Sequence, residues 1–451
     1  MVKKIMATGI SKNGWANHSC IIPPEDYAGS VDFEVTYPDK YSASQILQCH
    51  PKSNYKELYH SNTSNQIYFG ENFDVLSYLY HNLNYSGKVN LIYIDPPFGT
   101  NSMFQTRNQK NSYKDDLIGS HYIEFIRRRL VFLKELLTSD GAIFVHLDNN
   151  MVFQIKLIMD EVFGSKNFRG FITRKKCSNK NYTRNTFGNV SDYILFYSKN
   201  GKHKWNRSTE TWSDEKINKE YPCIDEKTGR RYKKVPIHAP GVRNGETGKP
   251  WKDMLPPPGK HWQYTPDKLS ELDKRGEIYW SSSGNPRRKV FFDEDKGIPV
   301  QDIWLNFQDS VNQNVKITGY PTEKNPFLLE RIVNAASNEG DILLDCFAGS
   351  GSSLDVANQL GRSYIGIDNS YEAIANIIKR FSHGLKDMGD YVSNKKEVND
   401  PYQNSFVFSP HTTYCPDNAV SSNFSFLVDT LYIDLANTLL QKYMSMKINA
   451  I

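Results

Sequence analysis

Two stretches of this chain alternate short apolar runs with amphipathic helical patterns, and this alternation limits the fold more than any other feature of the sequence. In the first stretch, apolar runs at residues 66–70, 91–94 and 142–146 are separated by helical patterns. In the longest of these patterns, the apolar residues that recur every three or four positions are Ile123, Ile126, Leu130, Leu133 and Leu137. This spacing places them on one face of a helix. Strands that alternate with such helices predict a doubly wound, Rossmann-like α/β fold.

The alternation stops near residue 166 and resumes at Asn325. Beyond Asn325 the sequence predicts a helix and then strands at 341–345 and 363–368, joined by a glycine-rich turn and a second helix. The intervening region is turn-rich, and one apolar run within it, 193–197, looks like a strand of the main sheet. A chain of 451 residues can hold one large core and a smaller inserted body. We therefore expect an α/β core that is interrupted by an insertion.

Positive charge is concentrated in this insertion. The whole chain has a net charge of +5, yet residues 166–260 alone contain 22 Lys and Arg against 9 Asp and Glu. The aromatic residues interleaved with these charges are Phe168, Phe171, Tyr182, Phe187, Trp205, Trp212 and Tyr232. A basic segment with interleaved aromatic residues is typical of nucleic-acid binding. The alternative is a lysine-rich surface that is only solvated.

Several other classes of protein are not expected. No apolar run reaches the length of a transmembrane helix, and no apolar stretch follows the basic residues after Met1, so we expect a cytoplasmic protein without a membrane partner. The six cysteines form no Cys-x-x-Cys pair, which argues against a disulfide framework or a structural zinc site. The histidines, including His146, His238 and His261, lack metal-ligand spacing, so we expect no metal site.

The tetrapeptide Asp95-Pro96-Pro97-Phe98 follows the apolar run that ends at residue 94. The Asp95 carboxylate can accept a hydrogen bond from an amino group, and the prolines leave their carbonyl groups free to accept a second one. The Phe98 ring can stack on a flat ring. This set suits a planar aromatic amine, such as the amino group of adenine or cytosine. The alternative is a strand that ends in a Pro-Pro turn, with Asp95 solvated and Phe98 in the core.

A second candidate site follows the strand at 341–345. The turn Phe347-Ala348-Gly349-Ser350-Gly351-Ser352-Ser353 leads into a helix, as in nucleotide-type cofactor loops where glycines allow close approach of the ligand. Asp368 ends the next strand and could accept hydrogen bonds from a ribose diol. It could equally cap the helix that opens near Ser370.

Two cofactors compete for this loop. A dinucleotide favours a third glycine near position 354, where this chain has Leu354. S-adenosylmethionine needs no phosphate site, can use Asp368 for its ribose, and carries an ammonium group that Asp345 could contact. We therefore expect S-adenosylmethionine.

These motifs resemble those of the amino-group DNA methyltransferases, specifically the permuted group in which the catalytic motif precedes the Phe-x-Gly-x-Gly cofactor loop. The tetrapeptide at Asp95 matches the catalytic motif of adenine-N6 enzymes, and Tyr320-Pro321-Thr322-Glu323-Lys324 resembles the Pro-Thr-x-Lys segment that helps to hold the cofactor's carboxylate end. Asn325 departs from the family, which usually has Pro there. Glu71 stands where the family has an acidic contact to the cofactor's adenine.

The resemblance implies a set of site residues. The catalytic residues would be Asp95, Pro96, Pro97 and Phe98. The cofactor-binding residues would be Glu71, Thr322, Lys324, Asp345, Phe347, Gly349, Gly351, Ser352 and Asp368.

The implied activity is site-specific methylation of adenine N6 in duplex DNA, within a restriction-modification system. The target base would be flipped out and stacked on Phe98, while Asp95 and the Pro96 carbonyl accept its amino protons. Cytosine-N4 methylation remains open, although N4 enzymes more often carry Ser at position 95. A non-catalytic DNA-binding relative and a nicotinamide-dependent oxidoreductase are further alternatives. Pro222-Cys223 suggests a cytosine-C5 enzyme, but it lies in a polar stretch far from any strand-end loop.

The resemblance also divides the chain. Residues 1–60 form an N-terminal extension of unknown role, 61–165 the catalytic half, 166–310 the basic insertion with the target-recognition region, 311–385 the cofactor-binding half, and 386–451 a tail with a helix at 424–444. The partner is double-stranded DNA. Because the relatives include restriction-linked subunits, solitary enzymes and dimers, a restriction endonuclease partner and a second copy of the chain both remain open.

Overall fold

The structure is a computed structural model that describes residues 34–97, 103–105, 111–114, 119–177, 185–309, 316–317, 323–383, 386–387 and 423–444. Two of the expected site residues, Phe98 and Thr322, lie outside these ranges.

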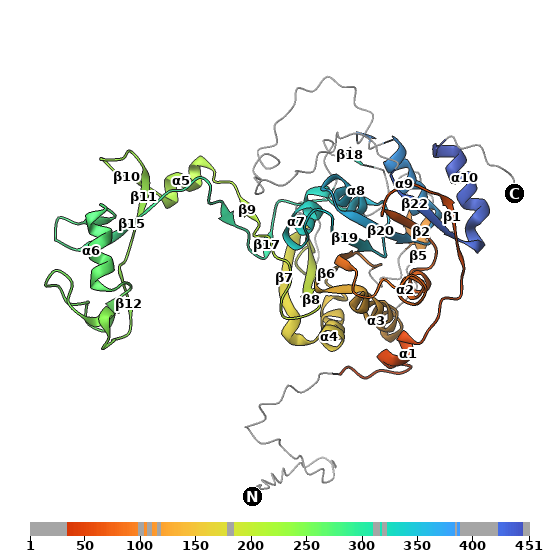
Figure 1. Cartoon of the computed structure of the whole chain (residues 1–451), viewed down its shortest axis with the longest axis horizontal. Helices are drawn as coiled ribbons and strands as arrows, with labels where there is room; N and C mark the ends of the chain where they lie inside the picture. Colours follow the sequence, from red (N-terminus) through yellow and green to blue (C-terminus); the bar gives the residue numbers. More distant parts are fainter. Residues whose placement is uncertain are drawn as a thin grey trace, which may run out of the picture.

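A ten-stranded sheet forms the centre of the main body (Figure 1). In spatial order its strands are β1 (Tyr55–Tyr59), β22 (Ser425–Asp429), β2 (Gln66–Phe69), β20 (Ser363–Asp368), β19 (Ile342–Asp345), β3 (Val89–Ile94), β6 (Leu137–Leu147), β8 (Ser191–Ser198), β7 (Phe168–Lys175) and β17 (Ile303–Trp304). From β22 to β6 all neighbours are parallel, whereas β8 is antiparallel to both β6 and β7 and β1 is antiparallel to β22.

Helices cover both faces of this sheet. They are α1 (Ala43–Leu47), α2 (Asn72–His81), α3 (Gly119–Leu136), α4 (Val152–Phe163), α7 (Pro326–Ala336), α8 (Ser352–Gln359), α9 (Tyr371–His383) and α10 (Ile433–Met444). Side chains alternate between the faces of a strand, so in β3 Leu91 joins one hydrophobic core and Ile92 the other. The core of Ile92 contains α2, α3 and α4, and the core of Leu91 contains α7 to α10. The predicted doubly wound α/β fold is confirmed.

The insertion forms a separate body between β8 and β17, to one side of the main sheet (Figure 1). Its elements are β9 (Thr209–Glu210), α5 (Asp214–Glu220), β10 (Cys223–Ile224), β11 (Arg231–Val235), β12 (His238–Pro240), β13 (Lys260–Trp262), α6 (Pro266–Lys274), β14 (Ile278–Trp280), β15 (Pro286–Phe291) and β16 (Ile298–Pro299). It has its own core, which consists of Ile237, Trp251, Trp262, Leu269, Leu272 and Ile278. We call this body, residues 209–299, the insertion module.

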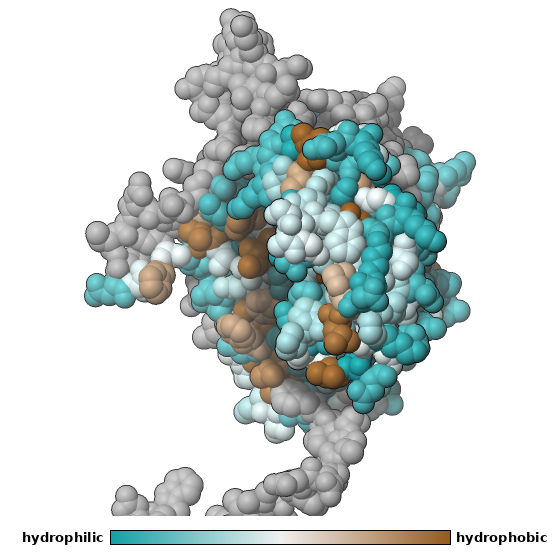
Figure 2. Space-filling view, turned by 90° about the vertical axis from the view of Figure 1, so that its left-hand side faces the viewer, coloured by the Kyte–Doolittle hydropathy of each residue, from teal (hydrophilic) through white to brown (hydrophobic). Residues whose placement is uncertain are grey.

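The insertion module presents a mixed surface. Figure 2 views the molecule from the side on which the module stands, and hydrophilic residues cover much of this face with hydrophobic patches between them. Apolar side chains of the module that are exposed include Val242 and Leu255.

Short elements complete the described chain: β4 (Met103–Gln105), β5 (Asn111–Lys114), β18 (Lys316–Ile317), β21 (Lys386–Asp387), and the 3₁₀ helices η1 (Ser165–Asn167), η2 (Glu246–Gly248) and η3 (Thr430–Tyr432). Among the described residues, no helix combines the length and the apolar character needed to cross a membrane.

The first 60 residues contain α1 and β1. Two expectations about secondary structure were wrong. The segment 424–444 was expected to be one helix, but it begins with β22, because Phe426 and Val428 pack in one core and Leu427 packs towards the other, as strand periodicity requires. The basic region supplies β7 to the main sheet as well as β8, since charged residues in β7 conceal its apolar pattern.

Candidate active site

Three aspartates converge at the carboxyl edge of the central strands. Asp95 follows β3, Asp345 ends β19 and Asp368 ends β20. Because β3, β19 and β20 are parallel neighbours, these ends lie at the same edge of the sheet. The chain order also reverses between β19 and β3, with β20 on one side and β6 on the other. Ligands of open α/β sheets bind at such a switch point.

The two oxygens of Asp95 have different surroundings. Oδ2 forms an ion pair of 2.8 Å with Nζ of Lys324, and both side chains are largely buried. Oδ1 is buried and accepts no hydrogen bond from the described part of the chain. Pro96, also buried, and Pro97 follow at once. A buried acceptor without a donor is rare in folded proteins and marks a place where a ligand can supply the missing hydrogen bond.

Lys324 is held just before α7. The next residue, Asn325, caps this helix by accepting a hydrogen bond from the Phe327 N–H, and its own side chain donates to the Gln308 carbonyl at 2.9 Å. Burial lowers the pKa of Lys324, but the carboxylates of Asp95, Asp309 and Asp192 outweigh it and the pKa is raised. Lys324 therefore carries its positive charge at neutral pH.

A buried histidine lies behind Asp95. Nδ1 of His146, in β6, is 2.8 Å from the hydroxyl of Tyr93, and Nε2 is 3.4 Å from Oδ2 of Asp192 in β8. Burial and the charge of Lys324 lower the pKa of His146, although Asp192 acts in the opposite direction. Burial alone would raise the pKa of Asp192, but the neighbouring His146 and the cations around it hold that pKa well below the usual range.

Strand β7 and the residue that directly follows it, Lys176, supply the remaining cations. Nζ of Lys176 lies 2.9 Å from Oδ1 of Asp192, and Arg174 pairs with Asp309 and donates from Nε to the Phe307 carbonyl at 2.9 Å. We call Asp95, Asp192, Asp309, Arg174, Lys176 and Lys324 the ion cluster. Its three carboxylates and three cations balance, which is the condition for burying charged groups at a tolerable cost. The sequence interpretation did not include Asp192, Arg174 or Lys176 in the site, although charged residues within strands of the main sheet were a usable signal.

The glycine-rich turn between β19 and α8 is held by Asp368. Its Oδ2 accepts from the Gly349 N–H and its Oδ1 from the Ser370 N–H, both at 2.9 Å. Gly349 and Gly351 have φ values of 51° and 75°, in the left-handed region that favours glycine. Asp368 thus bonds the start of the next helix and also fixes the turn, and burial raises its pKa. Each oxygen keeps a lone pair for a further donor.

Asp345 is buried beneath the same turn. It accepts hydrogen bonds from the Phe347 N–H at 3.0 Å and from the Ser353 hydroxyl. Burial raises the pKa of Asp345 to about 7, with the hydrogen bonds opposing this shift and the charges of Asp95 and Asp368 adding to it. No Lys or Arg of the described residues forms an ion pair with Asp345 or Asp368. A cationic ligand would favour the ionised forms, so the ammonium and sulfonium groups of S-adenosylmethionine fit this edge.

The side chain of Leu354 packs between α8 and β20. A Cβ atom on Gly366 of β20 would lie 2.2 Å from Cδ1 of Leu354, so the leucine fills the space above this glycine. Ser352 at the start of α8 receives a hydrogen bond of 3.1 Å from Arg380, which also donates to the Ser350 carbonyl at 2.9 Å. Arg380 supports the turn from behind and was not identified from the sequence.

Glu71 lines a pocket of about 370 Å³ near the same edge. Its carboxylate accepts from the Asp74 N–H at 3.0 Å as the cap of α2 and is ion-paired with Arg129. Phe73 and Phe125 supply aromatic walls, and the N-terminal segment supplies Pro38 and Asp39.

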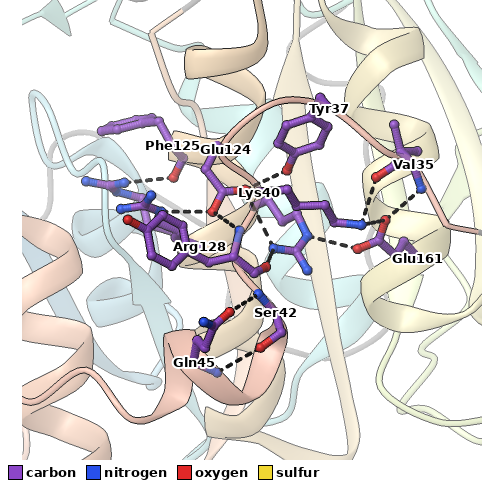
Figure 3. Close-up of polar contacts among 12 residues, drawn as sticks. Val35, Tyr37, Lys40, Ser42, Gln45, Glu124, Phe125, Arg128 and Glu161 are labelled. Carbon is purple, nitrogen blue, oxygen red and sulfur yellow. Dashed lines mark hydrogen bonds and ion pairs between the residues drawn. The ribbon is translucent and has the colours of Figure 1, made fainter.

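Figure 3 shows how this N-terminal segment is attached to α3 and α4. Lys40 pairs with Glu161 at 3.0 Å, Arg127 pairs with Glu161 at 2.9 Å, and the Tyr37 hydroxyl donates to Glu124 at 2.6 Å. These contacts hold the segment around Tyr37 and Lys40 against α3 and α4.

The sequence is similar to those of known DNA methyltransferases. A profile of the DNA methylase family matches residues 89–380. The Type II methyltransferase M.EcaI of Enterobacter cloacae is 46% identical over 358 residues, which cover 77% of this chain and 79% of that protein. The Type III restriction-modification enzyme StyLTI Mod subunit of Salmonella typhimurium is 29% identical over 64% of this chain, which spans about half (49%) of that subunit. The crystal structure of the M1.HpyAVI-SAM complex has 19% identity and a TM-score of 0.37, covering 70% of this chain and 98% of that one.

The fold and the acidic switch point define a Rossmann-like methyltransferase that uses S-adenosylmethionine. The chain belongs to the DNA methylase family, which includes enzymes for adenine N6 and for cytosine N4. It is a DNA methyltransferase, as the sequence motifs predicted.

Proposed function

We propose that the protein methylates N6 of adenine at a specific site in duplex DNA and serves a restriction-modification system. The observation that carries the choice of an amino acceptor is the Oδ1 atom of Asp95, which is buried without a donor beside the cofactor edge. An Asp at this position favours adenine over cytosine, since the N4 enzymes more often have Ser. The relatives named as Type II and Type III enzymes support the restriction-modification assignment.

The chain's own groups prepare the acceptor. An exocyclic amino group attacks poorly because its lone pair is delocalised into the ring. Hydrogen bonds from its two protons to Asp95 Oδ1 and to the Pro96 carbonyl favour a tetrahedral nitrogen with a localised lone pair. Phe98 would stack on the flipped base. The backbone turn that carries these groups fixes their alignment, which supplies much of the acceleration in a displacement reaction.

Bound S-adenosylmethionine supplies a methyl group on sulfonium, and the S–CH₃ bonding pair stays on sulfur as the N–CH₃ bond forms. The acceptor nitrogen then loses one proton, which Asp95 receives before its release to water. Asp368 would hold the ribose hydroxyls, Asp345 the ammonium group, Thr322 and Lys324 the carboxylate end, and Glu71 the adenine. Phe347, Gly349, Gly351 and Ser352 would shape the turn around the cofactor.

The insertion module would read the DNA. It contains 11 of the 22 Lys and Arg of residues 166–260, and such cations neutralise phosphates. A body with its own hydrophobic core can present these charges on a stable surface. Binding to DNA should therefore weaken steeply with salt.

The test is product identification. The purified protein is incubated with duplex DNA and isotopically labelled S-adenosylmethionine, the DNA is digested to nucleosides, and the labelled nucleoside is identified by mass spectrometry. We expect N6-methyladenine at one sequence context. N4-methylcytosine as the only product would replace adenine by cytosine, and absence of labelled DNA from any duplex library would refute the proposal.

A further inference from the structure

Lys324 belongs to a segment that resembles a cofactor-binding motif. Its ammonium group also contacts the carboxylate of Asp95. Its Nζ lies 2.8 Å from Oδ2 of Asp95, and its side chain is 8% exposed. We propose that Lys324 is a positioning residue for methyl transfer: it holds one oxygen of Asp95, so that the other oxygen alone is presented to the acceptor amino group. This inference rests on the proposed function of Asp95.

The surroundings of Lys324 keep its ammonium group in place. On the chain side, Asn325 caps α7 and bonds the Gln308 carbonyl, which fixes the backbone next to Lys324. Around the ammonium group, Asp309 is held by Arg174 and Asp192 is held by Lys176 and His146. The neighbouring carboxylates thus have other cations of their own. Lys324 is the cation that directly contacts Asp95 among the described residues.

The consequence for Asp95 is a single free acceptor. A carboxylate with both oxygens free can turn about its Cβ–Cγ bond and accept a donor in several geometries. The ion pair at Oδ2 removes this freedom and leaves Oδ1 as the acceptor. In a displacement reaction, small errors in the orientation of the nucleophile cost large factors in rate. Electrostatic interactions link Asp95 to Lys324, Asp345, His146 and Tyr93. Asp309, Asp192 and Arg174 interact with Lys324.

Without Lys324, the ion cluster would hold three carboxylates and two cations. A buried carboxylate that loses its counter-ion recruits another donor or takes up a proton. Either change competes with the hydrogen bond to the acceptor amino group. The loss should therefore appear in the methyl-transfer step, even when the cofactor site is saturated.

A double-mutant cycle separates this role from cofactor binding. Lys324→Met, Asp95→Asn and the double variant are compared with the unmodified enzyme in single-turnover methyl transfer at saturating DNA and S-adenosylmethionine. Binding of S-adenosylhomocysteine is measured on each protein by calorimetry. We expect Lys324→Met to lower the saturated rate about 100-fold when Asp95 is present, and to change it less than about 3-fold in the Asp95→Asn background.

Two matched variants complete the design. Lys324→Arg keeps the charge and should recover at least about 10-fold of the lost rate. Lys204→Met removes a partly buried lysine that pairs with Asp341 at the opposite end of the sheet, so it should lower the melting temperature and leave the saturated rate within about 3-fold. If Lys324→Met does not fold, Lys324→Gln takes its place in the cycle.

The inference is overturned if the rate effects of Lys324→Met are equal in the two backgrounds, or if the whole loss appears in the affinity for S-adenosylhomocysteine. Should Asp95→Asn be too slow to measure, the division between saturated rate and affinity in the Asp95 enzyme decides by itself. An unmodified enzyme that methylates no DNA would refute the proposed function instead, so the two failures are distinguishable.

Discussion

Around Asp95 each carboxylate of the ion cluster is paired with a cation, whereas Asp345 and Asp368 receive hydrogen bonds from backbone N–H groups and a hydroxyl. Both regions lie at one edge of the same sheet. In the region of Asp95, the charges of the ion cluster balance before any ligand binds, so this region suits an acceptor that is itself uncharged, such as an amino group. In the second region, no Lys or Arg of the described residues pairs with Asp345 or Asp368, and burial raises the pKa of Asp345. A cationic ligand would oppose this rise, so the difference divides the edge into an acceptor side and a cofactor side.

Replacing Asp95 should have the largest effect. In Asp95→Ala the acceptor hydrogen bond is lost, and we expect the single-turnover rate to fall about 1000-fold. Affinity for S-adenosylhomocysteine, measured by calorimetry, should change little, because the acceptor side is distinct from the cofactor side. Asp140→Ala, in β6 and away from this edge, is the control. Equal losses in rate and in affinity would contradict the separation of the acceptor side from the cofactor side.

Asp345 tests the cofactor side. We expect Asp345→Asn to weaken S-adenosylmethionine binding about 30-fold by removing a carboxylate close to a cation. In the unmodified protein, affinity should rise as pH increases through about 7, because the carboxyl group ionises there. The variant should lose this rise. Asp341→Asn, just before β19 at its opposite end, should keep it, and a pH-dependent affinity in Asp345→Asn would contradict the assignment.

The ion pairs that Glu161 forms with Lys40 and Arg127 (Figure 3) should contribute to the stability of the fold and not to catalysis. Glu161→Gln removes the partner of Lys40 and Arg127, and we expect about 1–3 kcal/mol loss in free energy of unfolding by denaturant titration. Burial raises the pKa of Glu161, but hydrogen bonds from Val35, Lys40 and Arg127 lower it below its usual value. Its contribution is therefore present at neutral pH and lost as pH falls below the usual glutamate range.

A matched control is the exposed pair Lys268–Glu271, in which both side chains are about half exposed (47% and 50%). Glu271→Gln should cost less than about 0.5 kcal/mol. The saturated rate of methyl transfer should stay within about 3-fold in Glu161→Gln. A large loss of rate with unchanged stability would mean that this cluster belongs to the active site.

Replacing Ser353 should have the smallest effect on cofactor affinity, and its dependence on pH makes the test specific. Its hydroxyl donates to Asp345 and opposes the rise in the pKa of that carboxyl group. In Ser353→Ala the pKa of Asp345 should rise further, so cofactor affinity at pH 7 should fall about 3-fold. At pH 9, where the carboxyl group is ionised in both proteins, most of this difference should vanish. A loss that is equal at the two pH values would assign Ser353 a direct contact with the cofactor instead.

Local patterns sufficed for the fold class and for the positions of the three aspartates. Apolar periodicity identifies strands and helices, and an acidic residue directly after an apolar run lies at a strand end wherever that strand packs. The same signal failed for β22, because its apolar alternation continues into the helical pattern of α10. It also failed for β7, where Arg169 and Arg174 interrupt the apolar run.

The sequence by itself determined that this chain is an α/β protein of the DNA methylase family that uses S-adenosylmethionine, because the motifs are continuous and their chemistry is local. The tertiary structure alone decided which charges meet. Lys324 is more than 200 residues from Asp95, and His146, Arg174 and Asp192 come from three further strands. Sheet pairing brings these groups within ion-pair distance, and only the buried environment makes their balance of charge matter.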